Sequence, residues 1–540
     1  MQKQRAWWHR STVYQIYPRS FYDSDGDGIG DLRGIAAKLD YLALLGVDIL
    51  WLCPVYASPN DDNGYDIADY RRIMKEFGTM ADMDWLIAEA AKRGIKLMLD
   101  IVANHTSDEH PWFMAARQGK DNPYHDYYIW TKTPNNLVSV FGGSAWQYEE
   151  SIGEYYLHLF SRKQPDLNWH NPRVRQEMAD VITFWLKKGV GGFRFDVIDL
   201  IGKIPQKNIT SNGPYLHQYV RELNEKSFGP HDVLTVGEAW GATPDTGLEW
   251  SLPANHELNM IFQFEHLTLD QAKFKGEKWD VIPFSLIELK SVLSQWQSRL
   301  QDKGWNSLFW NNHDTPRVVS RFGDDGRYRV ASAKMLATLL YGMAGTPYIY
   351  QGEEIGMTNV RFPQLDDYRD LETLNLYRDR LAAGYRPNGV MASIHAKSRD
   401  NARTPLPWDA GINAGFTTGI PWIKVNPNYQ QINIAAALAD PDSIFHYYRR
   451  LINLRKTADW LVYGSYQLLL PGHEQLFAYV REYHNRRYLV FGNFSEQTLT
   501  VDPAALHITP TAASLLNNYA TPPLLAEGVV RPWEGGIVSL

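Results

Sequence analysis

The sequence predicts an α/β protein, namely a (β/α)8 TIM barrel with an irregular insertion after strand 3 and a C-terminal antiparallel β domain. Short apolar runs alternate with segments whose apolar residues recur every three to four positions, as in strands followed by helices. Eight such runs can be counted, mostly with a helix between them, and the pattern breaks off after the third. Beyond Leu461 the helical patterns give way to short apolar runs, which indicates a small β domain.

The first three strands and their helices are the clearest part of the pattern. The expected elements are a strand at 13–17, a helix at 32–45, a strand at 49–53, a helix ending at Gly94 and a strand at 95–102. The first helix is followed by Gly46, a residue type that often terminates helices. The third strand contains only Lys96 and Asp100 as polar residues. Such strands are typical of parallel sheets covered by helices on both faces.

The pattern resumes at Asn171 and Pro172, a favourable N-cap and first residue of a helix. Five further strands are expected at 192–198, 233–239, 260–264, 307–311 and 346–350. Another long, polar and irregular insertion is expected at about 356–430. The predicted domains are a barrel at 1–103 and 171–462, an inserted domain at 104–170 and a C-terminal β-sandwich at 463–540.

Composition narrows the class of protein. The chain has 540 residues and a formal net charge of −7, with 44% apolar and 21% charged residues, as in ordinary globular proteins. Its acidity argues against a nucleic-acid partner. The single cysteine, Cys53, allows no internal disulfide, and no apolar stretch is long enough to span a membrane. We therefore expect a cytoplasmic, monomeric enzyme with no membrane partner.

Acidic residues end three of the predicted strands. Asp196 ends the fourth, Glu238 the fifth, and Asp314 follows the seventh. The carboxyl ends of barrel strands meet at one rim, so these acids are expected to lie close together. Arg194, two residues before Asp196 on the same strand face, is expected to keep that acid ionised, whereas Trp240 and the apolar strand should raise the pKa of Glu238. Two carboxyls with pKa values driven apart are typical of glycoside hydrolysis.

An acidic loop near the N-terminus is a candidate metal site. Asp23, Asp25, Asp27 and Asp31 begin like an EF-hand loop, but the twelfth position is Gly34 instead of the required Glu. Four converging carboxylates would repel one another without a cation, and oxygen ligands favour Ca²⁺ or Mg²⁺. The alternative is a solvated acidic turn.

Four sequence blocks together resemble the α-amylase superfamily (glycoside hydrolase family 13) over essentially the whole chain. These blocks are Asp100-Ile-Val-Ala-Asn-His105, Gly192-Phe-Arg-Phe-Asp196, Gly237-Glu238 and Asn312-His-Asp314. The run Gln164-Pro-Asp-Leu-Asn168 resembles the signature of the oligo-1,6-glucosidase subfamily. Within that subfamily, Val236-Gly-Glu-Ala-Trp-Gly-Ala-Thr-Pro244 is most similar to the dextran glucosidases (glucan 1,6-α-glucosidases).

This resemblance implies a role for each matching residue. Asp196 would be the nucleophile, Glu238 the general acid/base, and Asp314 the acid that holds the 2- and 3-hydroxyls of the sugar. Further substrate-binding residues implied by the resemblance are Asp62, Tyr65, His105, Arg194, Val197, Trp240, Lys278, His313 and Arg399. Asp62 and Arg399 would close the pocket behind the terminal glucose, Tyr65 would stack on it, and Arg194 would support the nucleophile.

The resemblance also bears on linkage and on the metal. Val197 after the nucleophile is associated with α-1,6 bonds, while Trp240 and Lys278 would line the next subsite. The family carries a structural Ca²⁺ at the acidic loop, with the carbonyl of Ile29 as a further ligand. No organic cofactor is expected, and the partner is an oligosaccharide substrate.

The sequence thus predicts a retaining exo-acting α-glucosidase that releases glucose from α-1,6-linked isomaltooligosaccharides and dextran. Retention requires the two catalytic carboxyls to lie about 5–5.5 Å apart. One alternative is a trehalose-6-phosphate hydrolase, but the basic cluster that would bind the phosphate at the pocket entrance is not apparent in the sequence. A second alternative is an α-1,4-active glucosidase, which Val197 disfavours. A sucrose isomerase is disfavoured because no Arg-Leu-Asp-Arg-Asp run follows strand six. A non-catalytic transporter subunit is disfavoured because all three acids are present.

Overall fold

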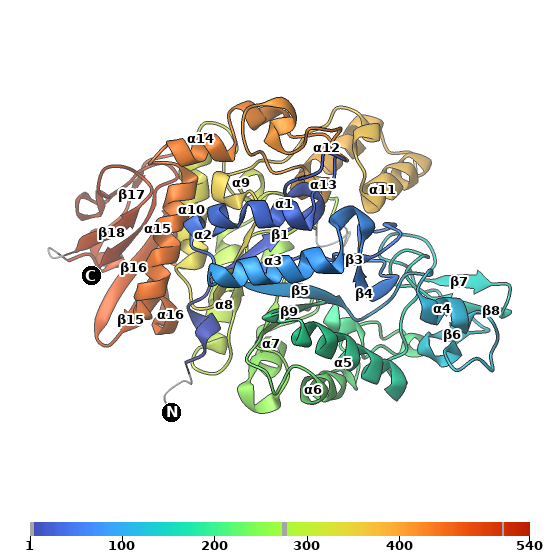
Figure 1. The fold of residues 1–540 in the computed structure, drawn as a ribbon. Coiled ribbons are helices and arrows are strands. Elements are labelled where there is room, and N and C mark those ends of the chain that lie inside the picture. The colour runs from blue at the N-terminus through green and yellow to red at the C-terminus, as the bar shows by residue number, and fades with distance from the viewer. Residues whose placement is uncertain (1–4, 273–277, 510–511) are drawn as a thin grey trace.

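The computed structural model describes residues 5–272, 278–509 and 512–540. Its centre is an eight-stranded parallel sheet in which successive barrel strands pair, except for the sixth and the seventh (Figure 1). The strands are β1 (Val13–Ile16), β2 (Ile49–Leu52), β5 (Lys96–Val102), β9 (Gly192–Asp196), β10 (Leu234–Glu238), β11 (Met260–Phe262), β12 (Ser307–Leu308) and β13 (Thr346–Tyr350). Strands β1 and β13 pair, and β11 contacts β12, so the sheet closes into a barrel. All eight predicted strands are confirmed.

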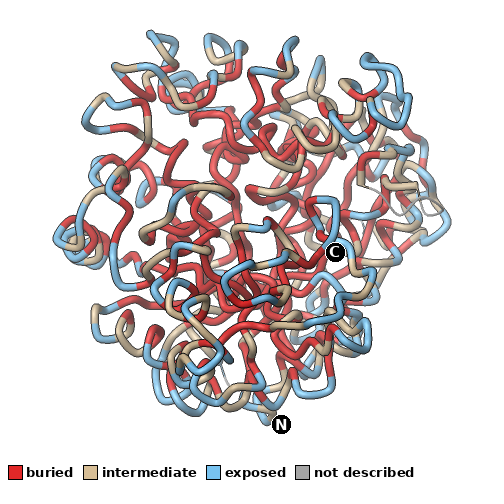
Figure 2. Tube along the Cα trace, turned by 90° about the vertical axis from the view of Figure 1, so that its right-hand side faces the viewer, coloured by how far each residue is buried: buried red, intermediate tan, exposed pale blue. Residues whose placement is uncertain are grey.

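Helices surround this barrel. The outer helices are α1 (Leu32–Ala37), α2 (Leu39–Leu45), α3 (Met80–Lys92), α5 (Pro172–Lys187), α6 (Leu216–Lys226), α7 (Pro244–Ser251), α8 (Leu286–Leu300), α9 (Val318–Arg321), α10 (Arg329–Tyr341), α15 (Ile444–Thr457) and α16 (Asp459–Tyr463). Helix α5 begins as predicted, with Asn171 accepting from Arg173 N and Pro172 first. The buried residues lie at the centre of the molecule and the exposed ones on its outside (Figure 2).

The helix predicted at 32–45 is two helices. Helix α1 ends at Ala37 and α2 begins at Leu39, with Lys38 between them in a non-helical conformation (φ −108°, ψ 8°). The Lys38 ammonium lies 4.0 Å from the ring centre of Tyr22 and 4.2 Å from that of Trp408. These cation–π contacts stabilise the break, which the apolar spacing alone did not reveal.

The segment after β5 is less irregular than predicted. It contains α4 (Pro111–Ala116) and an antiparallel sheet of β6 (Trp130–Thr131), β8 (Glu154–Leu157) and β7 (Trp146–Glu149). A short pair, β3 (Tyr56–Ala57) and β4 (Asp69–Ile73), precedes it and lies on the same side of the barrel (Figure 1). The apolar and aromatic residues of this segment do not recur every three to four positions, and its strands are short. Its sequence therefore resembles that of a loop.

The insertion after β13 is partly helical, so its prediction as irregular was wrong for residues 371–403. This part contains α11 (Leu371–Ala382), α12 (Pro387–Lys397) and α13 (Asp400–Arg403), and α14 (Ile434–Ala439) follows the insertion. Only Thr373 and Arg380 of α11 are buried, while its Leu376 and Tyr377 are partly buried against a small apolar cluster. Its start is stabilised by Asp370, whose carboxylate accepts from Thr373 N at 3.1 Å.

The C-terminal segment packs against the barrel side opposite these insertions (Figure 1). Its main sheet is antiparallel and contains β14 (Ser465–Leu469), β15 (Leu476–Tyr483), β16 (Arg486–Asn493), β20 (Gly535–Ser539) and β18 (Ala513–Asn517). A second pair consists of β17 (Leu499–Thr500) and β19 (Val529–Val530). Lys290 of α8 joins the barrel to this region, since its buried ammonium donates to the carbonyls of Leu470, His473 and Leu476.

Within the described part of the chain, no helix combines the length and apolar character needed to cross a membrane.

Candidate active site

A pocket of about 400 Å³ opens where the carboxyl ends of the barrel strands meet the two insertions. Ten of the predicted catalytic and substrate-binding residues line it: Asp62, Tyr65, His105, Asp196, Val197, Glu238, Trp240, Lys278, Asp314 and Arg399. Arg194 and His313 are not among the lining residues and lie directly behind them. The structure therefore brings together residues that are up to 337 positions apart in the chain.

Arg194 connects three acids from three neighbouring strands. Its Nη1 donates to Asp100 of β5 at 2.8 Å and to Asp196 of β9 at 2.6 Å. Its Nη2 donates to Glu238 of β10. The side chain is 1% exposed, so these contacts form out of water. The two predicted catalytic carboxyls thus share one guanidinium.

The charge of this cluster modifies the prediction that Arg194 keeps Asp196 ionised. Arg194 contacts Asp196 as expected, but burial raises the pKa of Asp196 well above its usual range, and Arg194 opposes this rise without reversing it. Burial likewise raises the pKa of Asp100. One cation cannot offset three carboxylates, so the cluster as a whole binds a proton more readily than separate acids would. A proton is therefore available beside the two catalytic carboxyls.

Val197 has a strained backbone directly after Asp196. Its φ of 34° and ψ of 46° lie in the left-handed region, which a β-branched residue rarely adopts. Such strain costs of order 1–3 kcal/mol and concentrates at functional sites. Here it brings the backbone N–H of Val197 to 3.3 Å from Glu238 Oε2 and places its side chain on the pocket wall.

Ion pairs hold several of the lining side chains. Arg399 lies 3.2 Å from Asp62, so these two predicted residues form an ion pair. The guanidinium is also held by Asp370, at 2.6 Å. Arg403 donates to Asp314 Oδ1 at 2.6 Å. Burial opposes ionisation, but His313, Arg403 and Arg399 together hold the pKa of Asp314 well below its usual range.

The two predicted histidines occupy different environments. His105 lines the pocket, and burial lowers its pKa to about 4, so its ring is neutral at pH 7. Gln164 donates to both Asp62 and His105, at 3.2 Å each, and so fixes two pocket residues at once. His313 is fully buried and lies outside the lining, with Nε2 3.0 Å from Asp314 and its ring stacked on Tyr65. It positions pocket residues from behind, which its sequence position did not indicate.

The pocket lining also includes Trp240 and Lys278. Trp240 is 47% exposed, stacks on Phe264 and donates its indole N–H to Glu238 at 2.8 Å. Lys278 pairs with Glu372.

A basic cluster, absent from the sequence prediction, lies beside Lys278. Arg321 and Lys397 also line the pocket, and both pair with Asp270. Lys278 was predicted as a substrate-binding residue, but its cluster with Arg321 and Lys397 was missed because the three residues come from segments more than 40 positions apart.

Other residues of the site were also missed in the sequence. Asp100 begins a block that was recognised, but its contact with Arg194 depends on the register of β5 against β9. Arg403 follows Arg399 by one helical turn, which is a signal that could have indicated it. Asp370 and Asp199 have no local sequence signal that distinguishes them from capping or turn residues.

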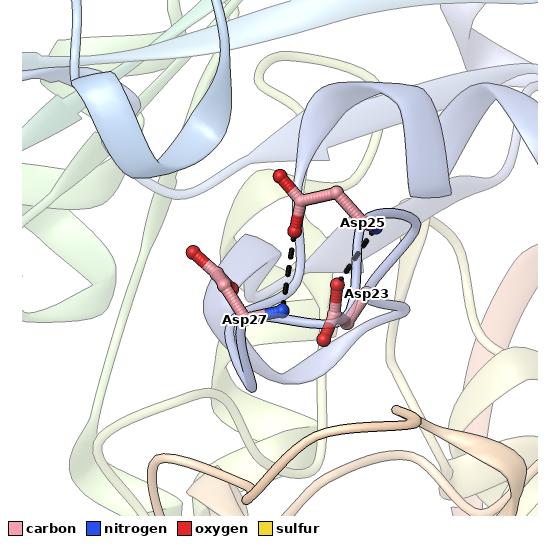
Figure 3. A group of neighbouring side chains, drawn as sticks. All are labelled: Asp23, Asp25 and Asp27. Atoms are coloured by element: carbon pink, nitrogen blue, oxygen red, sulfur yellow. Dashed lines mark hydrogen bonds between the residues drawn. The ribbon is translucent and has the colours of Figure 1, made fainter.

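The acidic loop gathers three of the four predicted carboxylates. Oxygens of Asp23, Asp25 and Asp27 lie within 4.8 Å of one another (Figure 3). Asp31 is outside this group because its carboxylate caps α1, accepting from Gly34 N at 2.7 Å, and also accepts from Ser24. Burial and the neighbouring acids raise the pKa of Asp27. The three clustered carboxylates fit a hard cation such as Ca²⁺ or Mg²⁺.

Comparison with known proteins defines the class. A model of the alpha-amylase catalytic domain matches residues 15–464, and the chain belongs to this family of glycoside hydrolases. It is 56% identical to an oligo-1,6-glucosidase of Parageobacillus thermoglucosidasius, with 99% of each chain covered. It is 53% identical to a glucan 1,6-alpha-glucosidase of Streptococcus pneumoniae, covering 99% of this chain and 100% of the relative. The predicted family is therefore confirmed.

Solved structures show the same fold with other activities. A trehalose-6-phosphate hydrolase of Bacillus licheniformis is 44% identical, with a TM-score of 0.94 over 99% of this chain and 100% of that one. A trehalulose synthase of Pseudomonas mesoacidophila is 42% identical, with a TM-score of 0.93 and the same coverage. The fold alone therefore does not distinguish between the substrates of these relatives. The residues of the pocket have to be compared instead.

The Arg403–Asp314 contact predicts the effect of a substitution. Arg403→Lys keeps the charge but cannot reproduce the contacts to both Asp314 and the His313 carbonyl. We expect kcat/KM on an α-glucoside substrate to fall about 10-fold, since losing one hydrogen bond to a charged group costs about 1.5 kcal/mol. Steady-state kinetics measure this. Arg386→Lys, at an exposed position of the same insertion, is the control. An unchanged kcat/KM would contradict the assigned contact.

Proposed function

We propose that the protein is a retaining, exo-acting α-glucosidase that releases glucose from the non-reducing ends of α-1,6-linked isomaltooligosaccharides and dextran. The main support is that Asp196 and Glu238 share Arg194 in a pocket that is also lined by the Asp62–Arg399 ion pair. We infer that this ion pair closes the pocket behind a single terminal sugar, which favours exo-action.

The chemistry proceeds in two displacements. Asp196 attacks the anomeric carbon while Glu238 gives its proton to the departing glycosidic oxygen, leaving a glucosyl ester on Asp196. Glu238, now ionised, removes a proton from water, and the resulting oxygen attacks the same carbon and releases Asp196. Asp314, kept ionised by its cationic neighbours, would accept hydrogen bonds from the 2- and 3-hydroxyls of the sugar. Tyr65 and His105 would contact the same ring.

The α-1,6 preference is supported by Val197 and by the relatives. Val197 lies on the pocket wall beside the nucleophile, where its branched side chain narrows the entrance for the leaving sugar. Trp240 and Lys278 lie on that side and would bind the leaving sugar by stacking and hydrogen bonding. The relatives that match the whole chain include enzymes named for α-1,6 glucosidic bonds.

The charge of the pocket disfavours a phosphorylated substrate. Among the residues that the structure describes, its lining contains six acidic side chains against four basic ones, a formal balance of −2. Lys278 is paired with Glu372, and Arg321 and Lys397 are paired with Asp270. A phosphate dianion in the pocket would be repelled by the excess of negative charge. None of the three cations Lys278, Arg321 and Lys397 is unpaired. Trehalose-6-phosphate hydrolysis is therefore the second candidate, supported by the basic residues themselves and by a structural neighbour.

We further propose that Asp23, Asp25 and Asp27 hold a structural Ca²⁺, or Mg²⁺, with no part in the chemistry. The loop is joined to the insertion after β13, because Thr417 donates its hydroxyl to Asp23 and Phe416 O accepts from Asp23 N. A cation there would stabilise the loop and the insertion that carries Arg399. Cytoplasmic location and a monomeric state remain parts of the proposal.

A substrate panel tests the function. We expect rapid glucose release from isomaltotriose and dextran, little from maltose, and least from trehalose 6-phosphate, measured side by side by a coupled glucose assay. Asp196→Asn should abolish release from every substrate while leaving the melting temperature close to the wild-type value. Preference for trehalose 6-phosphate would replace the proposed function by the second candidate. Activity that survives Asp196→Asn would refute the assignment of the nucleophile.

Metal addition tests the acidic loop. A ligand that binds only the folded state at 100 times its Kd stabilises it by about 2.7 kcal/mol. We therefore expect saturating Ca²⁺ to raise the melting temperature of chelator-treated protein and to leave kcat unchanged. The Asp25→Asn and Asp27→Asn variants should lose this response. A melting temperature unaffected by Ca²⁺ and Mg²⁺ would leave the loop as a solvated acidic turn.

A further inference from the structure

Arg399 contacts four acids. Its Nη2 lies 2.6 Å from Asp370 and 3.2 Å from Asp62, and its Nη1 lies 3.4 Å from Asp314. Its Nε donates to Asp370 at 2.8 Å and lies 3.6 Å from Glu372. The side chain is 9% exposed, so these contacts form largely out of water. One cation cannot pair fully with four anions, and Asp370 is the nearest of them.

Asp370 lies behind the pocket and is fixed there. It is fully buried, and it is not among the described residues that line the pocket, whereas the other three acids are. While its Oδ1 accepts from Arg399, its Oδ2 accepts from the backbone N–H of Thr373 at 3.1 Å and from the hydroxyl of Thr373 at 2.7 Å. Its own N–H donates to Asp400 at 2.9 Å. The Asp370 carboxylate is therefore a fixed anion at the start of α11.

Asp62 depends on Arg399 more than Asp314 does. Asp314 has a second and closer cation, because Arg403 lies 2.6 Å from it. Among the residues that the structure describes, Arg399 is the one cation paired with Asp62. The negative charge that Asp62 can offer to a substrate hydroxyl therefore depends on how strongly Asp370 holds the guanidinium.

We propose that Asp370 is a positioning residue for the sugar-binding pocket: it holds Arg399 away from Asp62, so that the Asp62 carboxylate can accept hydrogen bonds from the terminal glucose. This inference rests on the proposed function, in which Asp62 and Arg399 close the pocket behind a single sugar. Without the charge of Asp370, Arg399 would pair more closely with Asp62. The charge-assisted contact would then occupy the oxygen to which a sugar hydroxyl has to donate.

The substitution Asp370→Asn tests this role. Asparagine is a favourable N-cap, so its amide oxygen would keep the Thr373 contacts while its NH2 group, which accepts no hydrogen bond, would face Arg399. We expect the Ki of glucose, as a competitive inhibitor of p-nitrophenyl α-glucoside hydrolysis, to rise about tenfold, as for the loss of one hydrogen bond to a charged group. The Ki does not depend on the fraction of folded protein, so lower stability alone would leave it unchanged.

Thr373→Val is the matched control. It removes the hydroxyl contact to Oδ2 of Asp370 and leaves the contact between Oδ1 and Arg399 in place. It should lower the melting temperature and keep the Ki of glucose within about twofold of the wild-type value. If Asp370→Asn does not fold, Asp370→Ser replaces it, because serine also caps a helix but is too short to reach Arg399.

A double-variant cycle tests whether the effect passes through Asp62. In the wild-type background, Asp370→Asn should lower kcat/KM on p-nitrophenyl α-glucoside about tenfold, and in the Asp62→Asn background it should lower it by less than about twofold. An unchanged Ki, or equal losses in the two backgrounds, would overturn the proposal. Wild-type protein that releases no glucose from isomaltotriose would instead refute the proposed function, and this outcome is visible without any variant.

Discussion

The buried guanidinium of Arg194 is the interaction on which the site depends. Arg194 stands in register with Asp100 on the neighbouring strand β5, and it contacts the last residues of β9 and β10. Breaking a buried ion pair by removing one partner costs about 3–5 kcal/mol, because the other charge stays buried. The parallel register of three strands and the placement of the two catalytic carboxyls are therefore consequences of the same contacts.

The barrel and its insertions contribute different parts of the function. Strand ends supply the carboxyls proposed to react, as is general for this fold. The segment after β5 supplies His105 and Gln164, and the insertion after β13 supplies Arg399 and Arg403, which form ion pairs with Asp62 and Asp314. Chemistry is thus built on rigid strands, and substrate selection on the segments that differ most easily between relatives.

Apolar periodicity and strand-end acids made much of this structure predictable. All eight barrel strands are buried on both faces, so their sequences are nearly uninterrupted apolar runs, and Asp196 and Glu238 mark where two of them end. Helix α11 was missed although its leucines recur at helical spacing, because most of its other residues are charged or polar. The grouping of Asp100, Asp196 and Glu238 around one arginine, and the capping role of Asp31, depend on register and on competing local hydrogen bonds. Neither is encoded in residue spacing.

Asp196 and Glu238, joined by Arg194, are proposed to act by double displacement. The most direct measurement is the anomeric configuration of the glucose first released from isomaltotriose, followed by proton NMR before mutarotation. Retention requires α-glucose to appear first, with the β anomer growing in as the solution equilibrates. Initial release of β-glucose would mean inversion and would contradict the assignment of Asp196 as a nucleophile.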